Sequence, residues 1–371
     1  MRVIISGGGT GGHIFPAIAI ANALKEIDKS VEILFVGAEG RMEMEKVPAV
    51  GYKIEGLWIS GLQRRLTLDN LSFPFKVISS IMRSRKIIRS FSPDVVVGTG
   101  GFASGPLLRV AAGMKVPALI QEQNSFPGIT NKILGKRVNK ICVAYEGMEK
   151  YFPKEKIILT GNPVRQDILS IDGKKNEAMK FFGLNPEKKT LLVIGGSLGA
   201  RTINESVAGY LDMLLKNNIQ VIWQTGKSYT SNSSPNRTTV GCERSSREGA
   251  WIGAFITKMD MAYAAADIVV SRAGAISLSE LAIVKKPCIL VPSPNVAEDH
   301  QTKNAMSLVK NDAALFVKDT EAKEKLGKEI IALMNDVQRQ NQLSENISKL
   351  AFPDSAKKIA MEVLNLVKNK S

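Results

Sequence analysis

Short apolar segments rich in Val and Ile alternate with amphipathic helical patterns along almost the whole chain of 371 residues. They include RVIIS at residues 2–6, VEILFVG at 31–37 and DVVVGTG at 94–100, and later TLLVIGGS at 190–197 and DIVVSRAG at 267–274. Strands this apolar are typical of parallel sheets that helices cover on both faces. The alternation therefore predicts an α/β protein with parallel sheets.

The order of strand, glycine turn and amphipathic helix occurs twice, at residues 3–24 and again at 191–215. A chain of this length exceeds what one hydrophobic core usually supports. We therefore expect two doubly wound units, joined near GNPVRQDI at 161–168. A last amphipathic helix is expected within 352–370, where Ile359, Ala360, Val363 and Val367 form one apolar stripe.

The composition limits the classes of partner and compartment. A net charge of +15 implies an anionic partner, which could be nucleic acid, anionic lipid or a phosphorylated substrate. Cys142, Cys242 and Cys288 are an odd number at wide spacings, which favours buried thiols over disulfides or a zinc site. Because no apolar window of membrane-spanning length occurs and the chain starts on a strand pattern, we expect an untargeted, cytoplasmic protein.

Three glycine clusters follow predicted strands, namely GGGTGGH at 7–13, GTGGFASGP at 98–106 and GGSLGA at 195–200. Glycine lets backbone N–H groups approach an anion, and the helix that follows adds its positive dipole end. Loops beyond the carboxyl ends of strands line the ligand crevice of doubly wound folds. The clusters predict a cleft for phosphate-bearing substrates, and tight turns without a ligand are the alternative.

Two nucleotide motifs that glycine-rich loops suggest do not fit this chain. Gly7, Gly9 and Gly12 match GxGxxG, but the acidic residue expected at the end of the second strand is replaced by VGAEG, where Glu39 comes late. The first loop continues into His13 where a Walker loop needs Lys. A nicotinamide enzyme and an ATPase are therefore both disfavoured.

Seven motifs in order over almost the whole chain resemble the MurG family of peptidoglycan glycosyltransferases, family 28: GGGTGGHIFPAIAIA, GTGGFASGP, QEQNSFPGITNK, GNPVR, GGSLGA, SRAGAISLSELA and EDHQTKNA. The resemblance implies the GT-B fold, with two Rossmann-like domains facing across a cleft and the last helix returning to the first domain. It divides the chain into an acceptor-binding, membrane-associating domain at 1–163, a UDP-GlcNAc-binding domain at 164–345 and the returning helix at 346–371.

The activity that the resemblance implies is that of a hexosyltransferase in cell-wall synthesis. N-acetylglucosamine passes with inversion from UDP-GlcNAc to the MurNAc 4-hydroxyl of lipid I, giving lipid II. The resemblance assigns contacts with UDP-GlcNAc to Thr10, Gly11, Gly12, Asn124, Arg165, Ser197, Ile256, Ala275, Ile276, Ser277, Leu278, Ser279, Glu280 and Gln301, and contacts with the acceptor diphosphate to Gly100 and Gly101.

Physical reasons accompany several of these assignments. Arg165 offers a charged fork for diphosphate oxygens, and Ser197 offers a hydroxyl at a helix N-terminus. Glu280 can accept from two ribose hydroxyls, and a capping box with Ser277 is its structural alternative.

Attack by a sugar hydroxyl needs a base, and the chain has only two histidines, His13 and His300. His13 ends the first glycine loop on the acceptor side, and Glu122 is the rival base. No Asp-x-Asp pair occurs in the chain, so neither a metal nor another cofactor is expected. Helix ends and Arg165 would then stabilise the leaving diphosphate.

Residues 71–91 carry basic side chains without an acidic one, interleaved with apolar side chains. Such amphipathic basic segments bind anionic bilayers, and an acceptor with a lipid tail requires the enzyme to work there. We expect peripheral attachment to the cytoplasmic side of the membrane, with no nucleic-acid partner; an ordinary core helix with a solvated basic face is the alternative. The residues expected at the membrane are Phe73, Phe75, Ile78, Met82, Arg83, Arg85, Lys86 and Arg89.

Four other functions stay open at this point. A UDP-GlcNAc 2-epimerase or a glycolipid galactosyltransferase would share the fold but lack the pairing of GTGGFASGP with QEQNSFPGITNK. An NAD-dependent oxidoreductase would bind NADH, and a nucleotide-sugar sensor would bind UDP-GlcNAc without turnover.

Overall fold

The computed structural model describes residues 1–371 except 62–71, 197, 228, 230–244, 297–298 and 369–371. The chain divides into two compact units, and each is treated by itself. Unit 1 consists of Met1–Val164 and Phe352–Ser371, and unit 2 consists of Arg165–Ala351. The chain returns from unit 2 to unit 1 after Ala351, later than the expected boundary at 345/346. The reason is that helix α12 (Val337–Ser348) continues through that position and belongs to unit 2.

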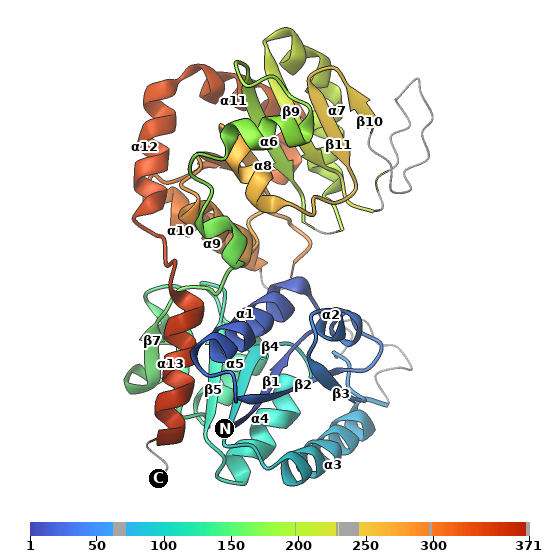
Figure 1. Cartoon of the computed structure of the whole chain (residues 1–371), viewed down its shortest axis with the longest axis vertical. Coiled ribbons are helices and arrows are strands. Elements are labelled where there is room, and N and C mark those ends of the chain that lie inside the picture. The colour runs from blue at the N-terminus through green and yellow to red at the C-terminus, as the bar shows by residue number, and fades with distance from the viewer. Residues whose placement is uncertain (62–71, 197, 228, 230–244, 297–298, 369–371) are drawn as a thin grey trace. The chain divides into compact units, whose positions relative to one another are not determined.

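Unit 1 is a seven-stranded parallel sheet in the order β3-β2-β1-β4-β5-β6-β7 (Figure 1). Its strands are β1 (Arg2–Gly7), β2 (Glu32–Ala38), β3 (Lys53–Leu57), β4 (Val95–Gly100), β5 (Ala118–Glu122), β6 (Lys140–Val143) and β7 (Ile157–Leu159). The central strands β1 and β4 are buried except at Arg2, as their continuous Val and Ile runs predict.

The helices of unit 1 connect these strands and cover both faces of the sheet. They are α1 (Gly11–Ile27), α2 (Glu43–Ala49), α3 (Phe73–Phe91), α4 (Ser104–Gly113) and α5 (Ile129–Gly135), with α13 (Ser355–Lys368) from the end of the chain. Strand order reverses between β1 and β4, which are neighbours although two strands lie between them in sequence. That switch point is where ligands bind in doubly wound folds.

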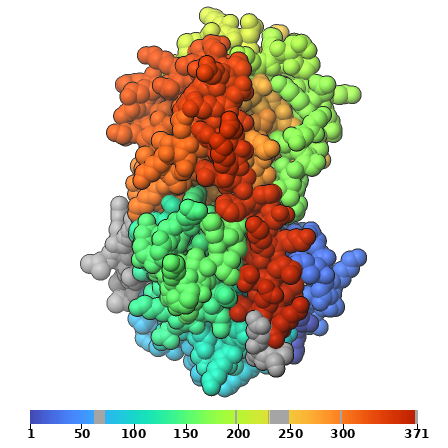
Figure 2. Space-filling model, turned by 90° about the vertical axis from the view of Figure 1, so that its left-hand side faces the viewer, coloured from blue at the N-terminus to red at the C-terminus, as the bar shows by residue number. Residues whose placement is uncertain are grey.

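Helix α13, red in Figure 1, packs against α1 in unit 1. Its stripe of Ala356, Ile359, Ala360 and Val363 is buried in a cluster with Val3 and other residues of the sheet and of α1. The opposite face of α13 lies at the surface of the unit (Figure 2). The expected apolar stripe of the last helix is therefore the face that packs.

Unit 2 repeats the doubly wound pattern with a seven-stranded sheet in the order β10-β11-β9-β8-β12-β13-β14. Its strands are β8 (Lys189–Ile194), β9 (Ile219–Gln224), β10 (Ser245–Arg247), β11 (Ala250–Gly253), β12 (Ile268–Ser271), β13 (Cys288–Leu290) and β14 (Leu315–Phe316). Only β10 runs antiparallel, against β11, among the described strands. The switch point lies between β8 and β12.

The helices of unit 2 are α6 (Lys175–Phe182), α7 (Arg201–Lys216), α8 (Met259–Ala265), α9 (Ala275–Ile283), α10 (His300–Val309), α11 (Ala322–Asn335) and α12. Cys288 in this unit and Cys142 in unit 1 are buried free thiols, and burial raises the pKa of each to about 12. Cys242 lies outside the described residues. No helix within the described ranges is long and apolar enough to span a membrane.

Candidate functional site

Two glycine loops meet at the switch point of unit 1. The loop after β1 leads into α1, and the loop after the neighbouring β4 leads into α4. The Gly8 N–H donates to the Gly100 carbonyl at 3.3 Å, and a Cβ on Gly101 would lie 2.3 Å from the Gly8 oxygen. Gly100 and Gly101 also have φ of +103° and +89°, which favour glycine. These glycines are required for the two loops to touch, a role separate from any ligand.

A buried carboxylate that sequence reasoning missed supports the first loop. Glu43, at the start of α2, is fully buried and accepts from the Gly9 N–H at 2.8 Å and the Ala38 N–H at 3.0 Å. A Cβ on Gly8 would lie 2.1 Å from the Glu43 carboxylate. Glu39, the late acidic residue of VGAEG, is exposed instead. The acid near the end of β2 therefore shapes the glycine loop.

His13 lies in the first turn of α1, half-buried beside these loops. Its Nδ1 is 2.9 Å from the Thr99 carbonyl oxygen and 3.1 Å from Gln123 Oε1. Thr99 belongs to β4 and Gln123 follows β5, so the switch-point strands position the imidazole. Because neither acceptor carries a hydrogen, Nδ1 carries a proton, and in the neutral ring the lone pair is on Nε2.

Glu122, the rival base, ends β5 and is 2% exposed. One carboxylate oxygen accepts from the backbone N–H and side-chain amide of Asn124, at 3.0 and 3.2 Å. The other accepts from the Gly128 N–H at 3.2 Å and Asn131 Nδ2 at 2.8 Å. Four donors therefore already occupy this carboxylate, and it organises the loop from 122 to 131.

Of the residues assigned to UDP-GlcNAc in unit 1, Thr10, Gly11 and Gly12 lie at the start of α1, and Asn124 follows β5. Thr10 is the N-cap of α1 and Gly12 lies in its first turn, and both are exposed, whereas Gly11 is half-buried. First-turn N–H groups have no acceptor within their own helix, so they suit an anion. Asn124 is half-buried beside Glu122.

Helix α9 follows β12 at the switch point of unit 2, and its Glu280 belongs to a largely buried ionic cluster with Arg165 and Tyr263. Arg165 Nε donates to Glu280 Oε1 at 3.0 Å, and the Tyr263 hydroxyl donates to Glu280 Oε2 at 3.0 Å. The Glu280 side chain is 8% exposed and Arg165 is 35% exposed, while Tyr263 is fully buried. Sequence reasoning missed Tyr263, because its contact joins α8 to α9.

Burial decides the electrostatics of this cluster. It raises the pKa of the Glu280 carboxyl above its ordinary value, although Arg165 and Tyr263 act in the opposite direction. Burial also raises the pKa of the Tyr263 phenol well above its ordinary value, with help from the adjacent carboxylate. Burial, the largest single influence, lowers the pKa of the Arg165 guanidinium, but Glu280, Asp167 and Tyr263 together outweigh burial and the pKa is raised. Arg165 therefore stays charged at the site.

The capping box between Ser277 and Glu280, the structural alternative for Glu280, does not form. Helix α9 begins after Gly274, so Ser277 lies inside its first turn, and no side chain caps the helix. The Glu280 side chain is held by Arg165 and Tyr263 instead. The segment assigned to the donor forms the N-terminal part of α9, with Ala275, Leu278 and Glu280 buried and Ile276, Ser277 and Ser279 half-buried.

The glycine loop of unit 2 lies between β8 and α7, where Gly196 and Gly199 have φ of +85° and +83°. Gln224, at the end of β9, donates to the Gly196 carbonyl at 3.1 Å and accepts from the Ile256 N–H at 2.9 Å. Sequence reasoning also missed this buried amide. It links the glycine loop to Ile256, and the resemblance assigns residues of both segments to UDP-GlcNAc. Ser197 lies outside the described residues.

Asp319 joins helix α7 to the segment that follows β12 in unit 2. Its carboxylate accepts from Arg272 Nη1, and it also accepts from Thr202 Oγ1 at 2.9 Å. The Arg272 guanidinium donates in turn to the carbonyls of Val291 and Pro292 at 2.8 and 3.1 Å. Gln301, assigned to the donor, is half-buried in α10 and its Oε1 accepts from the backbone N–H of Ser293 at 2.8 Å.

Among the described residues, no group of three or more His, Cys, Asp or Glu side chains could hold a metal ion.

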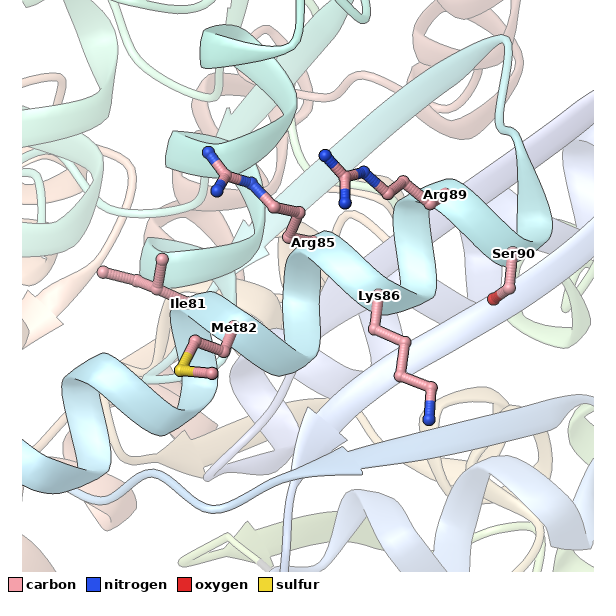
Figure 3. A pocket seen from close by; sticks show the side chains of 6 residues that line it. All are labelled: Ile81, Met82, Arg85, Lys86, Arg89 and Ser90. Atoms are coloured by element: carbon pink, nitrogen blue, oxygen red, sulfur yellow. The ribbon is translucent and has the colours of Figure 1, made fainter.

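Helix α3 of unit 1 has two different faces. Ile87 and Ile88 are buried with Ser80 and Ser84, but Phe75, Ile78 and Met82 are 69%, 57% and 68% exposed. A groove along the exposed side is lined by Ile81, Met82, Arg85, Lys86, Arg89 and Ser90 (Figure 3).

Figure 3 shows the guanidinium groups of Arg85 and Arg89 pointing to the same side of α3, and Lys86 pointing to another. Arg83 is exposed and its guanidinium forms an ion pair with Glu55 at 2.9 Å. Phe73 at the start of the helix is half-buried. Helix α3 thus presents large apolar side chains to solvent next to basic residues that are also exposed.

Comparisons with known proteins cover nearly the whole chain. Residues 3–143 match the Glycosyltransferase family 28 N-terminal domain, and residues 190–359 match the Glycosyltransferase family 28 C-terminal domain. The chain is 55% identical over 368 residues to the UDP-N-acetylglucosamine--N-acetylmuramyl-(pentapeptide) pyrophosphoryl-undecaprenol N-acetylglucosamine transferase of Flavobacterium psychrophilum, which covers 99% of this chain and 98% of that protein. The protein of the same name from Parabacteroides distasonis is 55% identical over 100% of this chain and 99% of its own.

Solved structures share the fold. The structure of Acinetobacter baumannii MurG has a TM-score of 0.76 and 24% identity, covering 98% of this chain and 99% of its own. The UDP complex of Staphylococcus aureus MnaA has a TM-score of 0.69 and 15% identity, covering 99% and 98%. At these identities the likeness establishes the two doubly wound domains that the sequence predicts.

Proposed function

The chain belongs to glycosyltransferase family 28, and we propose that it transfers N-acetylglucosamine from UDP-GlcNAc to the MurNAc 4-hydroxyl of lipid I, which gives lipid II. The observation that carries the proposal is identity of 55% over 99% of the chain to a relative named for that transfer. The two switch-point sites support it, because each offers helix N-termini for a phosphate-bearing ligand.

In unit 1, His13 is the general base. The acceptor hydroxyl gives its proton to His13 Nε2 as its oxygen bonds to the anomeric carbon of the donor sugar. The bond from that carbon to the diphosphate oxygen breaks, and its electron pair leaves with UDP, so the anomeric configuration is inverted. Thr99 and Gln123 both accept from Nδ1–H, which stabilises the imidazolium that forms. Glu122 holds the adjacent loop.

In unit 2, Arg165 and the starts of α7 and α9 stabilise the leaving diphosphate. The Arg165 guanidinium bonds Glu280 through Nε, so its terminal nitrogens can reach diphosphate oxygens. Glu280, held at both oxygens, has further lone pairs for ribose hydroxyls. The helix ends supply fixed partial positive charge without a bound metal.

Helix α3 is the surface that meets the membrane in this proposal. Phe75, Ile78 and Met82 would enter the headgroup boundary, and Arg85 and Arg89 would contact anionic lipid headgroups. A lipid-linked acceptor makes such a surface useful, because the enzyme and its substrate then share one plane. The proposal places the protein peripherally on the cytoplasmic side.

Assay of the purified chain with UDP-GlcNAc and a short-chain lipid I analogue tests the function. The expected result is release of UDP and a product heavier by one N-acetylhexosamine, both dependent on the acceptor. Conversion of UDP-GlcNAc to its 2-epimer without acceptor would replace the proposal by an epimerase. Binding of UDP-GlcNAc with no turnover would replace it by a sensor.

A further inference from the structure

Gln123 contacts the Nδ1 side of the His13 ring, and its amide nitrogen contacts three oxygen atoms. It is 2% exposed, and its Nε2 donates to the Thr99 carbonyl at 2.7 Å and to the Gln121 carbonyl at 3.2 Å. It also lies in hydrogen-bonding contact with Gln121 Oε1. Because these partners are all acceptors, the NH₂ group of Gln123 must face them, and its Oε1 is the atom left for His13.

The contact with His13 then has one consistent direction. Gln123 Oε1 lies 3.1 Å from His13 Nδ1, and the Thr99 carbonyl lies 2.9 Å from the same nitrogen. Turning the Gln123 amide over would place its oxygen against the Thr99 carbonyl, and that backbone oxygen cannot become a donor. The proton is therefore on Nδ1, and the lone pair is on Nε2.

Further buried amides hold Gln123 in this orientation. Gln121 Nε2 donates to Asn162 Oδ1 at 2.9 Å, and Asn162 Nδ2 donates to the Gln123 backbone carbonyl at 3.0 Å. Gln121 is fully buried and Asn162 is 1% exposed. A fully satisfied buried network of this kind is rigid, so the tautomer of His13 is set before any substrate arrives.

From these contacts we infer that Gln123 is a positioning residue for the transfer, one that keeps His13 in the tautomer whose Nε2 can accept the proton. The inference rests on the proposed function. Gln123 acts through His13 and need not touch the substrate. Loss of such a partner behind a metal-binding histidine costs about 10- to 100-fold in metal affinity or activity, and we expect a similar range here.

NMR spectroscopy can determine the tautomer of the His13 imidazole without overlap, because the chain has only two histidines. Protein labelled with ¹⁵N-histidine gives long-range ¹H–¹⁵N spectra with two ring systems, and His300→Gln assigns them. At alkaline pH, the expected His13 spectrum has a protonated-type Nδ1 and an unprotonated-type Nε2. The opposite pattern in the parent protein would overturn the inference whether or not any variant folds, and it would do so independently of turnover.

Gln123→Met tests the link to catalysis, because methionine has a similar length and cannot accept from Nδ1–H as an amide oxygen does. We expect kcat to fall about 10- to 100-fold with the KM for UDP-GlcNAc unchanged, and the His13 spectrum to show both tautomers. The loss is partial because Thr99 still accepts from Nδ1. A folded Gln123→Met protein with parent kcat and the parent tautomer would refute the assignment.

Gln220→Met is the matched control, since Gln220 is a similarly buried amide in unit 2, at 3% exposure, and donates to the Asn185 carbonyl at 2.8 Å. It should lower stability without altering the His13 spectrum. If the parent protein transfers no sugar but shows the expected tautomer, the proposed function fails and the geometry of Gln123 stands. If it transfers sugar with the opposite tautomer, the role of Gln123 and that of His13 Nε2 as the base both fail, whereas the transfer itself stands.

Discussion

Replacing Arg165 by alanine removes one of the two groups that hold the buried carboxylate of Glu280. The variant leaves Glu280 Oε1 without its donor at 3.0 Å, while the Tyr263 hydroxyl still reaches Oε2. Unit 2 then contains a carboxylate of 8% exposure with a single described partner. We expect Arg165→Ala to lower the free energy of unfolding of unit 2 and to weaken UDP binding as well.

The exposures of the two side chains set the size of the stability loss. Breaking a fully buried ion pair costs about 3–5 kcal/mol, whereas an exposed pair contributes roughly 1 kcal/mol or less. Glu280 is near the buried limit, but Arg165 is 35% exposed, so solvent screens the pair from one side. We therefore expect a loss of about 2 kcal/mol near pH 8, which lowers Tm by about 4–8 °C in a domain of this size.

The loss should depend on pH in a definite direction. Burial already raises the pKa of Glu280, and loss of the Arg165 charge raises it further. For a carboxyl whose pKa is higher in the folded state, the unfolded chain releases its proton first, so stability falls as pH rises above the ordinary glutamate value. Arg165→Ala should therefore cost little near pH 5 and more near pH 8.

A thermodynamic cycle isolates this interaction. Unfolding is followed by calorimetry at both pH values for the parent protein, Arg165→Ala, Glu280→Gln and the double variant. Because glutamine cannot carry the buried charge, Arg165→Ala should cost far less in the Glu280→Gln background. An equal loss in both backgrounds, or an equal loss at both pH values, would refute the account of the cluster. Titration with UDP measures the loss of binding separately.

Other consequences concern unit 1 and the membrane. His13→Ala should lower kcat by roughly 10²- to 10⁴-fold at unchanged UDP affinity, and turnover close to the parent rate would remove the imidazole base. Glu122→Ala should lower Tm, because four donors lose their acceptor; an inactive variant with parent Tm would make Glu122 the base. Turnover should persist in EDTA, and a requirement for added Mg²⁺ or Mn²⁺ would contradict leaving-group stabilisation by helix ends. Neutralising Arg85, Lys86 and Arg89 should weaken binding to anionic vesicles in a salt-sensitive way, by about 1 kcal/mol per residue, whereas neutralising three lysines of α11 should not.

The sequence predicts the fold because its signals are local. Apolar runs of four to seven residues followed by glycine turns fix where strands end and helices begin, and the restart at residues 191–215 indicates the second unit. The same signals place the glycine loops and His13 at the carboxyl ends of β1, β4 and β8. Parallel pairing then brings the loops of neighbouring strands together without further information.

The residues that the sequence does not reveal act over long separations. Glu43 reaches the Gly9 N–H from 34 positions away, and Gln224 reaches the Ile256 N–H across 32. Each is one of several polar side chains in its segment, and nothing local distinguishes it from a solvated residue. The capping box fails for a related reason, because Gly274 starts α9 earlier than the Ser277 pattern suggests.

Because unit 1 is made from both ends of the chain, its last helix is translated after all of unit 2. Residues 165–351 leave the ribosome as one continuous segment and can complete their sheet while the face of α1 that α13 covers is still bare. A frameshift or stop codon shortly before residue 355 would therefore damage the first half of the protein and spare the second. A gene cut after residue 164 would yield an incomplete unit 1 unless residues 352–371 were fused back through a linker.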